Sequence, residues 1–171
     1  MTPISLDAVN RMTPEAFVAA FGDIAEHSPW VAEAAAARRP FRSRDNMIAA
    51  FADAMTDAPQ SRQRALLEAH PDLAGRAAIA GTLTRDSKNE QAGAGLDTLT
   101  PDEFARFTDL NRTYRERNHI PFIFAVKGAT KHDILRGFEA RIGNSPDAEF
   151  QTALGQVARI IRFRLEDRVL A

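Results

Sequence analysis

The sequence predicts an all-α protein that folds as a single-domain irregular helical bundle. Helix starts are marked by a capping residue followed by proline or an acidic residue, and apolar residues recur between them at helical spacing. The start signals are Thr13-Pro14-Glu15, Ser28-Pro29, Ser43-Arg44-Asp45, Thr100-Pro101-Asp102-Glu103 and Ser145-Pro146-Asp147. The 171 residues suffice for one compact domain but not for two ordinary ones, so residues 1–171 are expected to form one domain.

Composition narrows the range of functions. A formal net charge of -1 gives no electrostatic reason to expect a nucleic acid partner. The chain has no cysteine, so disulfides, thiolate nucleophiles and thiolate metal sites are excluded. No stretch is apolar enough to cross a bilayer, and the ends carry neither a secretory signal nor a Ser-Lys-Leu address. We therefore expect a cytoplasmic protein with no membrane partner.

The first half of the chain is predicted to consist of amphipathic helices. Apolar residues recur three and four positions apart, and we interpret these stripes as core rather than as cofactor sites. The stripes are Phe17, Ala20, Phe21 and Ile24, followed by Met47, Ile48, Phe51 and Met55. The next helix, Ser61 to Ala69, must end before Pro71, because a residue that precedes proline is disfavoured in the α region. His70 therefore lies at a rigid break.

His70 is a candidate general acid or base, since imidazole exchanges protons near neutral pH. The structural alternative is a histidine at a helix C-terminus, stabilised there by the helix dipole. His27, His119 and His132 have no comparable setting, and no pair shows the HExxH spacing of a helical zinc site. A metal-dependent hydrolase is therefore not favoured, and no metal ligands are assigned.

Ser87 and Glu90 have the S-x-x-E spacing of a capping box, which predicts a helix that begins at Lys88. A purely structural role is the simplest interpretation of this spacing. The free amides of such a helix start could also bind an anion, and a small carboxylated substrate would suit them.

The segment from Ile120 to Val126 is a short apolar run whose periodicity does not distinguish strand from helix. A lone strand would leave its backbone groups without partners, so we expect a buried helical turn or an extended connector. Phe122 and Phe124 would then line an apolar wall.

The last helix carries a charge where an apolar residue is due. Arg164 follows Val157 by seven residues and lies on nearly the same side of the helix. Arg162 and Arg168 have easier routes to solvent, so Arg164 is expected to face the interior and to need an anionic partner. Either a buried ion pair, with Glu90 or another carboxylate, or a substrate contact would satisfy it. The buried face of this helix is expected to comprise Phe150, Ala153, Leu154, Val157, Ile160, Ile161, Leu165 and Val169.

In their order and spacing, several of these segments together resemble the family of 2-oxo-4-hydroxy-4-carboxy-5-ureidoimidazoline (OHCU) decarboxylases. They are Ala69-His70-Pro71-Asp72-Leu73, Ser87 to Gln91, Leu110-Asn111 through Tyr114, Pro121-Phe122-Ile123 and Ile160-Ile161-Arg162-Phe163-Arg164-Leu165. The resemblance implies an all-helical, cofactor-free and commonly dimeric enzyme that acts on a small ureidoimidazoline. The reaction is the last step from urate to (S)-allantoin.

The resemblance also implies roles for individual residues. His70 would be the catalytic acid, and Glu90 would help to orient the substrate. The resemblance implies a substrate-binding arginine at Arg162 or Arg164, and the periodicity of the last helix favours Arg164. The other residues that the resemblance assigns to substrate binding are Pro71, Ser87, Lys88, Asn89, Gln91, Phe122, Ile123, Phe124, Ala125 and Val126.

The alternative from another class is a catalytically inactive helical interaction module with the same fold. In such a module the polar residues would only cap helices and pair buried charges. In an enzyme, His70, Glu90 and Arg164 are expected to bound one cavity.

Overall fold

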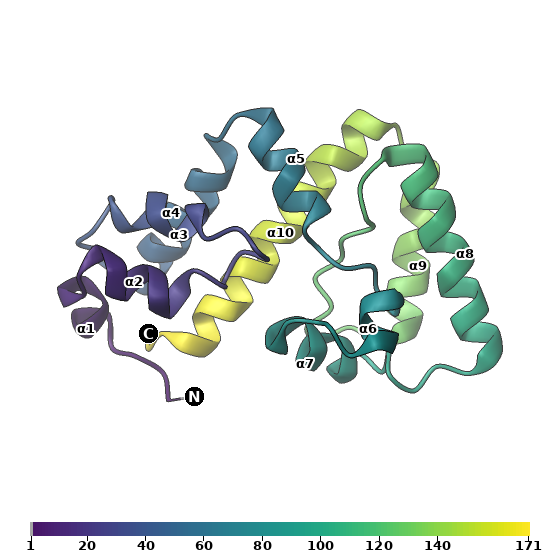
Figure 1. Cartoon of the computed structure of the whole chain (residues 1–171), viewed down its shortest axis with the longest axis horizontal. Helices are drawn as coiled ribbons and strands as arrows, with labels where there is room; N and C mark the ends of the chain where they lie inside the picture. The colour runs from purple at the N-terminus through teal and green to yellow at the C-terminus, as the bar shows by residue number, and fades with distance from the viewer. Residues whose placement is uncertain (1) are drawn as a thin grey trace. The chain divides into compact units, whose positions relative to one another are not determined.

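The computed structural model describes residues 2–171, apart from the side chain of Ala77, and confirms the all-α class (Figure 1). Within the described residues a parallel β-bridge joins Ile4 to Val169. The helices are α1 (Leu6–Arg11), α2 (Pro14–Phe21), α3 (Trp30–Ala36), α4 (Arg44–Thr56), α5 (Gln60–Glu68), α6 (Arg76–Ala80), α7 (Arg85–Gly93), α8 (Pro101–Asn118), α9 (Lys131–Arg141) and α10 (Pro146–Arg168).

The chain divides into two compact units. The first comprises the residues up to Ala69 together with Ala158–Ala171, and the second spans His70–Val157. Helix α10 contributes its N-terminal part to the second unit and its C-terminal part to the first. That residues 1–171 act as one domain stays a prediction.

The first unit is built around α3, which packs against α2 and α4. The ring of Phe17 lies 5.0 Å from that of Phe21 and 6.1 Å from those of Phe41 and Phe51, measured between centroids. The predicted stripes of α2 and α4 form this core, since their members are buried except for half-buried Ala20.

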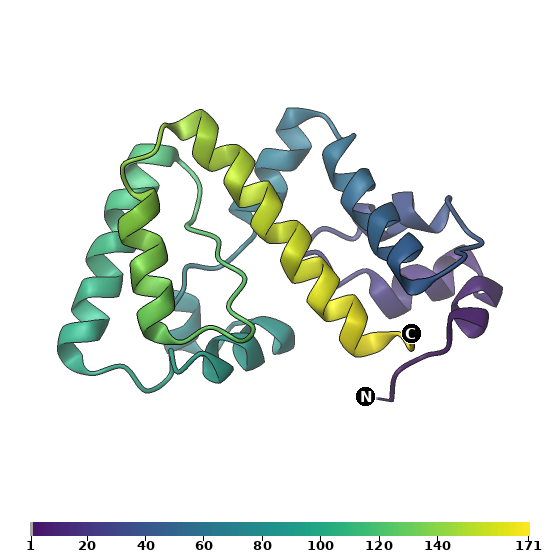
Figure 2. The ribbon, with the colours of Figure 1, turned by 180° about the vertical axis from the view of Figure 1, so that it is seen from behind.

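In the second unit, α8 and α9 lie side by side (Figures 1 and 2). Aromatic side chains fill the space between them. Phe122 stacks on Phe138 of α9 with 3.6 Å between ring centroids, and Tyr114 of α8 meets Phe122 edge-on at 5.2 Å. This packing anchors the segment that carries Phe122 to the core of the unit.

The capping signals locate most helix starts correctly. The side chains of Thr13, Ser43, Thr100 and Ser145 accept hydrogen bonds from first-turn backbone amides, as predicted. Ser28 is an exception, because its hydroxyl donates to the carbonyl oxygen of Glu26 and α3 begins two residues later.

Three further starts, capped by Ser5, Thr84 and Thr130, are absent from the sequence prediction. Thr130 forms a capping box in which Asp133, rather than glutamate or glutamine, occupies the third helical position.

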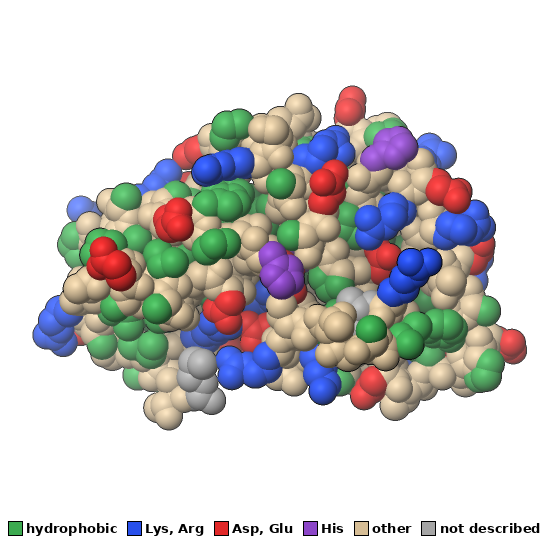
Figure 3. Space-filling model, viewed as in Figure 1, with side chains coloured by type: hydrophobic (Ala, Val, Ile, Leu, Met, Phe, Trp, Pro, Cys, Tyr) green, Lys and Arg blue, Asp and Glu red, His purple; other side chains and the backbone are tan. Residues whose placement is uncertain are grey.

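No helix among the described residues is long and apolar enough to span a lipid bilayer. On the face shown in Figure 3, acidic and basic side chains are interspersed and do not form separate fields. This distribution agrees with the small net charge of the chain.

Candidate active site

His70 is buried, with 6% of its surface exposed, and it begins the second unit. Helix α5 ends at Glu68 with Ala69 as its C-cap, so the predicted break before Pro71 is confirmed. His70 therefore lies beyond the helix end, and its imidazole is held in the protein interior.

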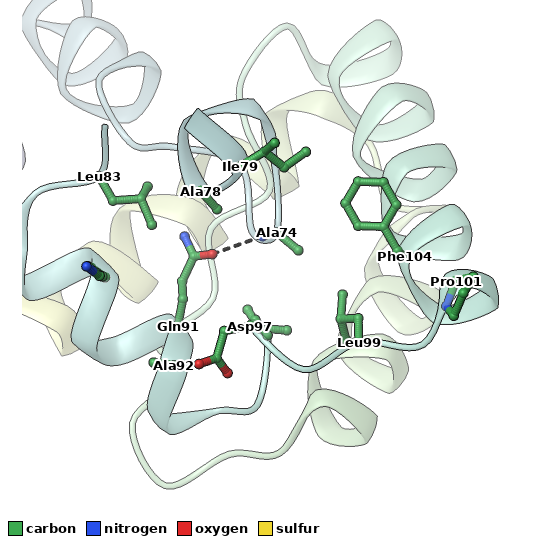
Figure 4. A pocket seen from close by; sticks show the side chains of 12 residues that line it. Ala74, Ala78, Ile79, Leu83, Gln91, Ala92, Asp97, Leu99, Pro101 and Phe104 are labelled. Atoms are coloured by element: carbon green, nitrogen blue, oxygen red, sulfur yellow. Dashed lines mark hydrogen bonds between the residues drawn. The ribbon is translucent and has the colours of Figure 1, made fainter. Parts of the chain in front are cut away.

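The segment that follows His70 is tied to two helices. Arg115 of α8 donates to the Asp72 carboxylate at 2.7 Å, and Asn111 of α8 donates to the carbonyl oxygen of Leu73 at 2.8 Å. The Ala74 amide donates to Oε1 of Gln91 in α7 at 3.0 Å, the bond drawn as a dashed line in Figure 4. These bonds fix the segment after His70 against both α7 and α8.

Helix α7 begins three residues earlier than predicted, at Arg85. Thr84 is its N-cap and accepts from the Ser87 amide at 3.3 Å, so the predicted capping box of Ser87 and Glu90 is wrong. The physical reason is that Thr84 offers an equivalent hydroxyl three residues upstream, which moves Ser87 into the first turn. The helix start consequently lies at residues 85–87 and not after Lys88, and its Ser87 amide is bound by the Thr84 cap.

The predicted binding residues of α7 lie on two different sides of this helix. Ser87 and Gln91 are buried and Glu90 is half-buried, whereas Lys88 and Asn89 are exposed. Positions 87, 90 and 91 share one side of a helix because they are three and four residues apart. That side faces the interior of the unit.

Residues 120–126, called the wall segment below, form an extended connector, which was one of the two predicted alternatives. Phe122 is 1% exposed and packs into the aromatic core, while Phe124 is half-buried beside Gly137 of α9. A Cβ atom on Gly137 would lie 2.7 Å from the Phe124 ring, so the close approach of that ring requires glycine.

A buried polar network that the sequence prediction missed joins α8, α9 and α10. The Glu149 carboxylate of α10 is fully buried and accepts from the Tyr114 hydroxyl at 2.6 Å and from Arg141 Nε at 2.9 Å. Burial, together with the bond to Glu149, raises the pKa of Tyr114 above its usual value. Glu149 precedes Ala153 by four residues on the buried stripe of α10, so the argument that identified Arg164 could also have identified Glu149.

Arg164 lies on the part of α10 that belongs to the first unit. It is 4% exposed, and its Nη1 donates to a Glu26 carboxylate oxygen at 3.0 Å and to the carbonyl oxygen of Ile24 at 3.1 Å. The predictions of burial and of an anionic partner are confirmed, and the partner carboxylate is Glu26.

Arg162 and Arg168, the two arginines of α10 that were expected to reach solvent, behave differently from each other. Arg162 is exposed and pairs with Asp45 and Glu166. The predicted route to solvent for Arg168 is wrong, because its side chain is 8% exposed and binds the Asp23 carboxylate. The last turn of α10 packs against the C-terminal end of α2, where Arg168 also donates to the carbonyl oxygen of Ala20.

A cavity of about 510 Å³ opens within the second unit (Figure 4). Its lining is largely apolar and includes Ile79, Leu83 and Phe104. Of the residues expected at the site, Lys88 and Gln91 line it. Among the described residues, no group of three or more His, Asp or Glu side chains is placed to hold a metal ion.

The structure thus places most of the predicted site residues in the second unit: His70, Pro71, Ser87 to Gln91 and Phe122 to Val126. Arg164 belongs to the first unit. The predicted meeting of His70, Glu90 and Arg164 around one cavity stays a prediction.

The fold and these residues define a class of all-helical proteins with a buried histidine and a polar helix, α7, in the same unit. Residues 10–166 match the family model described as OHCU decarboxylase, and the chain belongs to this family.

Two relatives have the name 2-oxo-4-hydroxy-4-carboxy-5-ureidoimidazoline decarboxylase. The protein of Haloferax volcanii is 44% identical over 168 residues, which cover 98% of each chain. That of Halalkalicoccus jeotgali is 43% identical over 167 residues, which cover 98% of this chain and 93% of the relative.

A solved structure supports the same assignment. The crystal structure of an (S)-allantoin synthase superimposes with a TM-score of 0.77 at 29% sequence identity. The match covers 97% of this chain and 54% of the synthase chain, so this chain spans about half the length of that protein.

Proposed function

We propose that this chain catalyses the cofactor-independent decarboxylation of OHCU to (S)-allantoin in urate catabolism. Membership of the decarboxylase family supports the reaction, and relatives with that name match over nearly their full length. The observation that carries the proposal is the buried His70, in a segment that a hydrogen bond from the Ala74 amide to Gln91 ties to α7.

The chemistry needs only ordinary side chains. In the substrate, the departing carboxylate is attached to a ring carbon beside a C=N bond. When the carbon–carbon bond breaks and carbon dioxide leaves, the electron pair moves toward that imine, so the substrate supplies its own electron sink. A proton delivered to one face of the former imine carbon then sets the configuration of allantoin. We assign this proton delivery to His70.

The other side chains bind and orient. Glu90 holds the hydroxyl or ureido end of the substrate, and the start of α7 near Ser87 faces its anionic or carbonyl oxygens. The remaining substrate-binding residues are Pro71, Ser87, Lys88, Asn89, Gln91, Phe122, Ile123, Phe124, Ala125 and Val126. Arg164 remains the arginine favoured for substrate contact, and its ion pair with Glu26 also gives it a structural role in the first unit.

The proposal extends to the organisation of the protein. Residues 1–171 act as one decarboxylase domain, since the family match from 10 to 166 includes parts of both units. A homodimer in the cytoplasm is proposed from the resemblance to the family. The ligand is a small molecule, and neither nucleic acid nor a membrane is proposed as a partner.

Circular dichroism of freshly generated substrate tests the proposed reaction. The protein should accelerate the decay and leave a signal of (S)-allantoin. Decay to racemic allantoin at the spontaneous rate would instead support an inactive interaction module.

A His70→Asn variant tests the proposed proton donor. It should fold like the wild type and lose about a hundredfold or more in kcat, which is the usual contribution of a general acid. His132→Asn is the matched control, because His132 is exposed on α9. Full activity of the His70→Asn variant would remove His70 from the mechanism.

A further inference from the structure

The backbone of the wall segment is held by side chains from two helices. Nη1 of Arg141, at the end of α9, donates to the carbonyl oxygen of Ile123 at 2.7 Å. The amide of Ala125 donates to Oε1 of Gln156 in α10 at 2.9 Å. A connector without regular secondary structure depends on such bonds for its path. Alternate residues of the wall segment are therefore fixed from α9 and α10.

Arg141 is itself held in a fixed orientation. Its Nε donates to the Glu149 carboxylate, which also accepts from the Tyr114 hydroxyl and, at 3.0 Å, from the Asn144 side chain. The guanidinium carbon lies 4.3 Å from the centroid of the Phe122 ring, within the range of a cation–π contact. The carboxylate and the ring thus direct Nη1 at the wall segment.

Stability alone does not explain why the charged pair of Arg141 and Glu149 is buried here. The Arg141 side chain is 11% exposed and that of Glu149 is 0% exposed, so both charges have lost most of their hydration. Well-packed apolar residues often stabilise such a position equally well. Only a planar guanidinium can bind a carboxylate through one nitrogen and a backbone oxygen through another in fixed geometry.

We propose that Arg141 is a positioning residue for decarboxylation, which fixes the wall segment through the carbonyl oxygen of Ile123 while Glu149 and Tyr114 orient its guanidinium. The inference rests on the proposed function, which assigns residues 122–126 to the substrate pocket. A displaced wall segment would misalign the substrate with its proton donor. Loss of Arg141 therefore raises KM and lowers the enantiomeric excess of allantoin. A merely structural role would reduce the folded fraction, and with the amount of folded enzyme matched to the wild type it would leave both quantities unchanged.

Arg141→Lys is the first test. The single amino group of lysine can pair with Glu149 but cannot hold the carbonyl oxygen of Ile123 in the same geometry. We expect KM to rise at least tenfold, with a measurable loss of enantiomeric excess. Gln156→Leu removes the second backbone bond at a half-exposed position and should act in the same direction. Gln151→Leu, on the exposed side of the same helix, is the control and should leave KM and enantiomeric excess unchanged.

Amide hydrogen exchange gives a readout that does not depend on activity. In Arg141→Lys, exchange at residues 123–126 should accelerate at least tenfold while exchange within α8 stays unchanged. Unchanged exchange in the wall segment would overturn the inference, and so would faster exchange with wild-type KM and enantiomeric excess. A wild-type protein without activity would instead remove the proposed function, and the exchange rates would still decide whether Arg141 holds the wall segment.

Discussion

The ion pair between Glu26 and Arg164 can be tested by removing the charge of one partner. The side chains are 1% and 4% exposed, and the closest nitrogen–oxygen distance is 3.0 Å. Glu26→Gln keeps the shape of the side chain and leaves the guanidinium of Arg164 buried without this counter-charge. The carbonyl oxygen of Ile24, which accepts from the same nitrogen, compensates only in part.

The expected loss follows from this geometry. Two unit charges at about 3 Å attract by about 5 kcal/mol at an effective dielectric constant of about 20. Breaking one partner of a buried pair costs about 3–5 kcal/mol, which agrees with that figure. For a chain of this size each kcal/mol lowers Tm by about 2–4 °C, so the variant should melt about 6–20 °C below the wild type.

The assay is thermal unfolding followed by far-UV circular dichroism, completed as a double-mutant cycle. Arg164→Met combined with Glu26→Gln should lose less stability than the sum of the two single variants, because both charges of the buried pair are then removed. Arg162→Met is the matched control on the same helix, since its exposed pairs are worth less than about 1 kcal/mol. A Glu26→Gln variant that melts within about 2 °C of the wild type would refute the reasoning, as would strict additivity in the cycle.

Two further predictions concern glycines of α9 and α10 and a carboxylate of α8. Gly155→Ala, whose added Cβ meets nothing within 4 Å, should stabilise α10 by about 0.5–1 kcal/mol, whereas Gly137→Ala should lower Tm and activity by displacing the Phe124 ring. Equal stabilisation by both substitutions would show that the ring moves without cost. Hydrogen bonds from Lys131 and from the backbone at the start of α8 lower the pKa of Glu103 to about 2. Because the pKa of Glu103 is lower in the folded state than in the unfolded state, the ionised carboxylate stabilises the folded protein above about pH 4.5. This stabilisation is lost as pH falls toward 2. In thermal scans, the Tm difference between the wild type and Glu103→Gln should shrink as pH falls over that range. A Tm difference that stays constant would contradict a stabilising role of the ionised Glu103.

Local signals predicted the helices better than they predicted exact helix starts. Capping and apolar spacing act within a few residues, so Thr13, Ser43 and Thr100 could be identified from the sequence. At α7 two hydroxyl groups three residues apart, Thr84 and Ser87, compete for the same role. Local rules do not decide between them, because the choice depends on which residues the rest of the second unit buries.

Burial of charge is predictable from periodicity, but the identity of the partner is not. The position of Arg164 on the apolar stripe of α10 predicted a buried arginine with an anionic partner. Its partner Glu26 is separated from it by 138 residues and lies just after α2, where no spacing rule applies. For Arg168 even burial was mispredicted, because solvent access at the end of a helix depends on which segment packs there.

The sequence by itself determined the all-helical class, the break before Pro71 that places His70 beyond a helix end, and the resemblance to the decarboxylases. These features depend on helix propensity, proline sterics and motif order, which are properties of neighbouring residues. Only the tertiary structure decided that Glu149, Tyr114 and Arg141 form one buried network and that Arg141 reaches the carbonyl oxygen of Ile123. The physical reason is that a buried polar atom takes whichever partner the packed helices bring within hydrogen-bond distance, and that distance bears no fixed relation to separation along the chain.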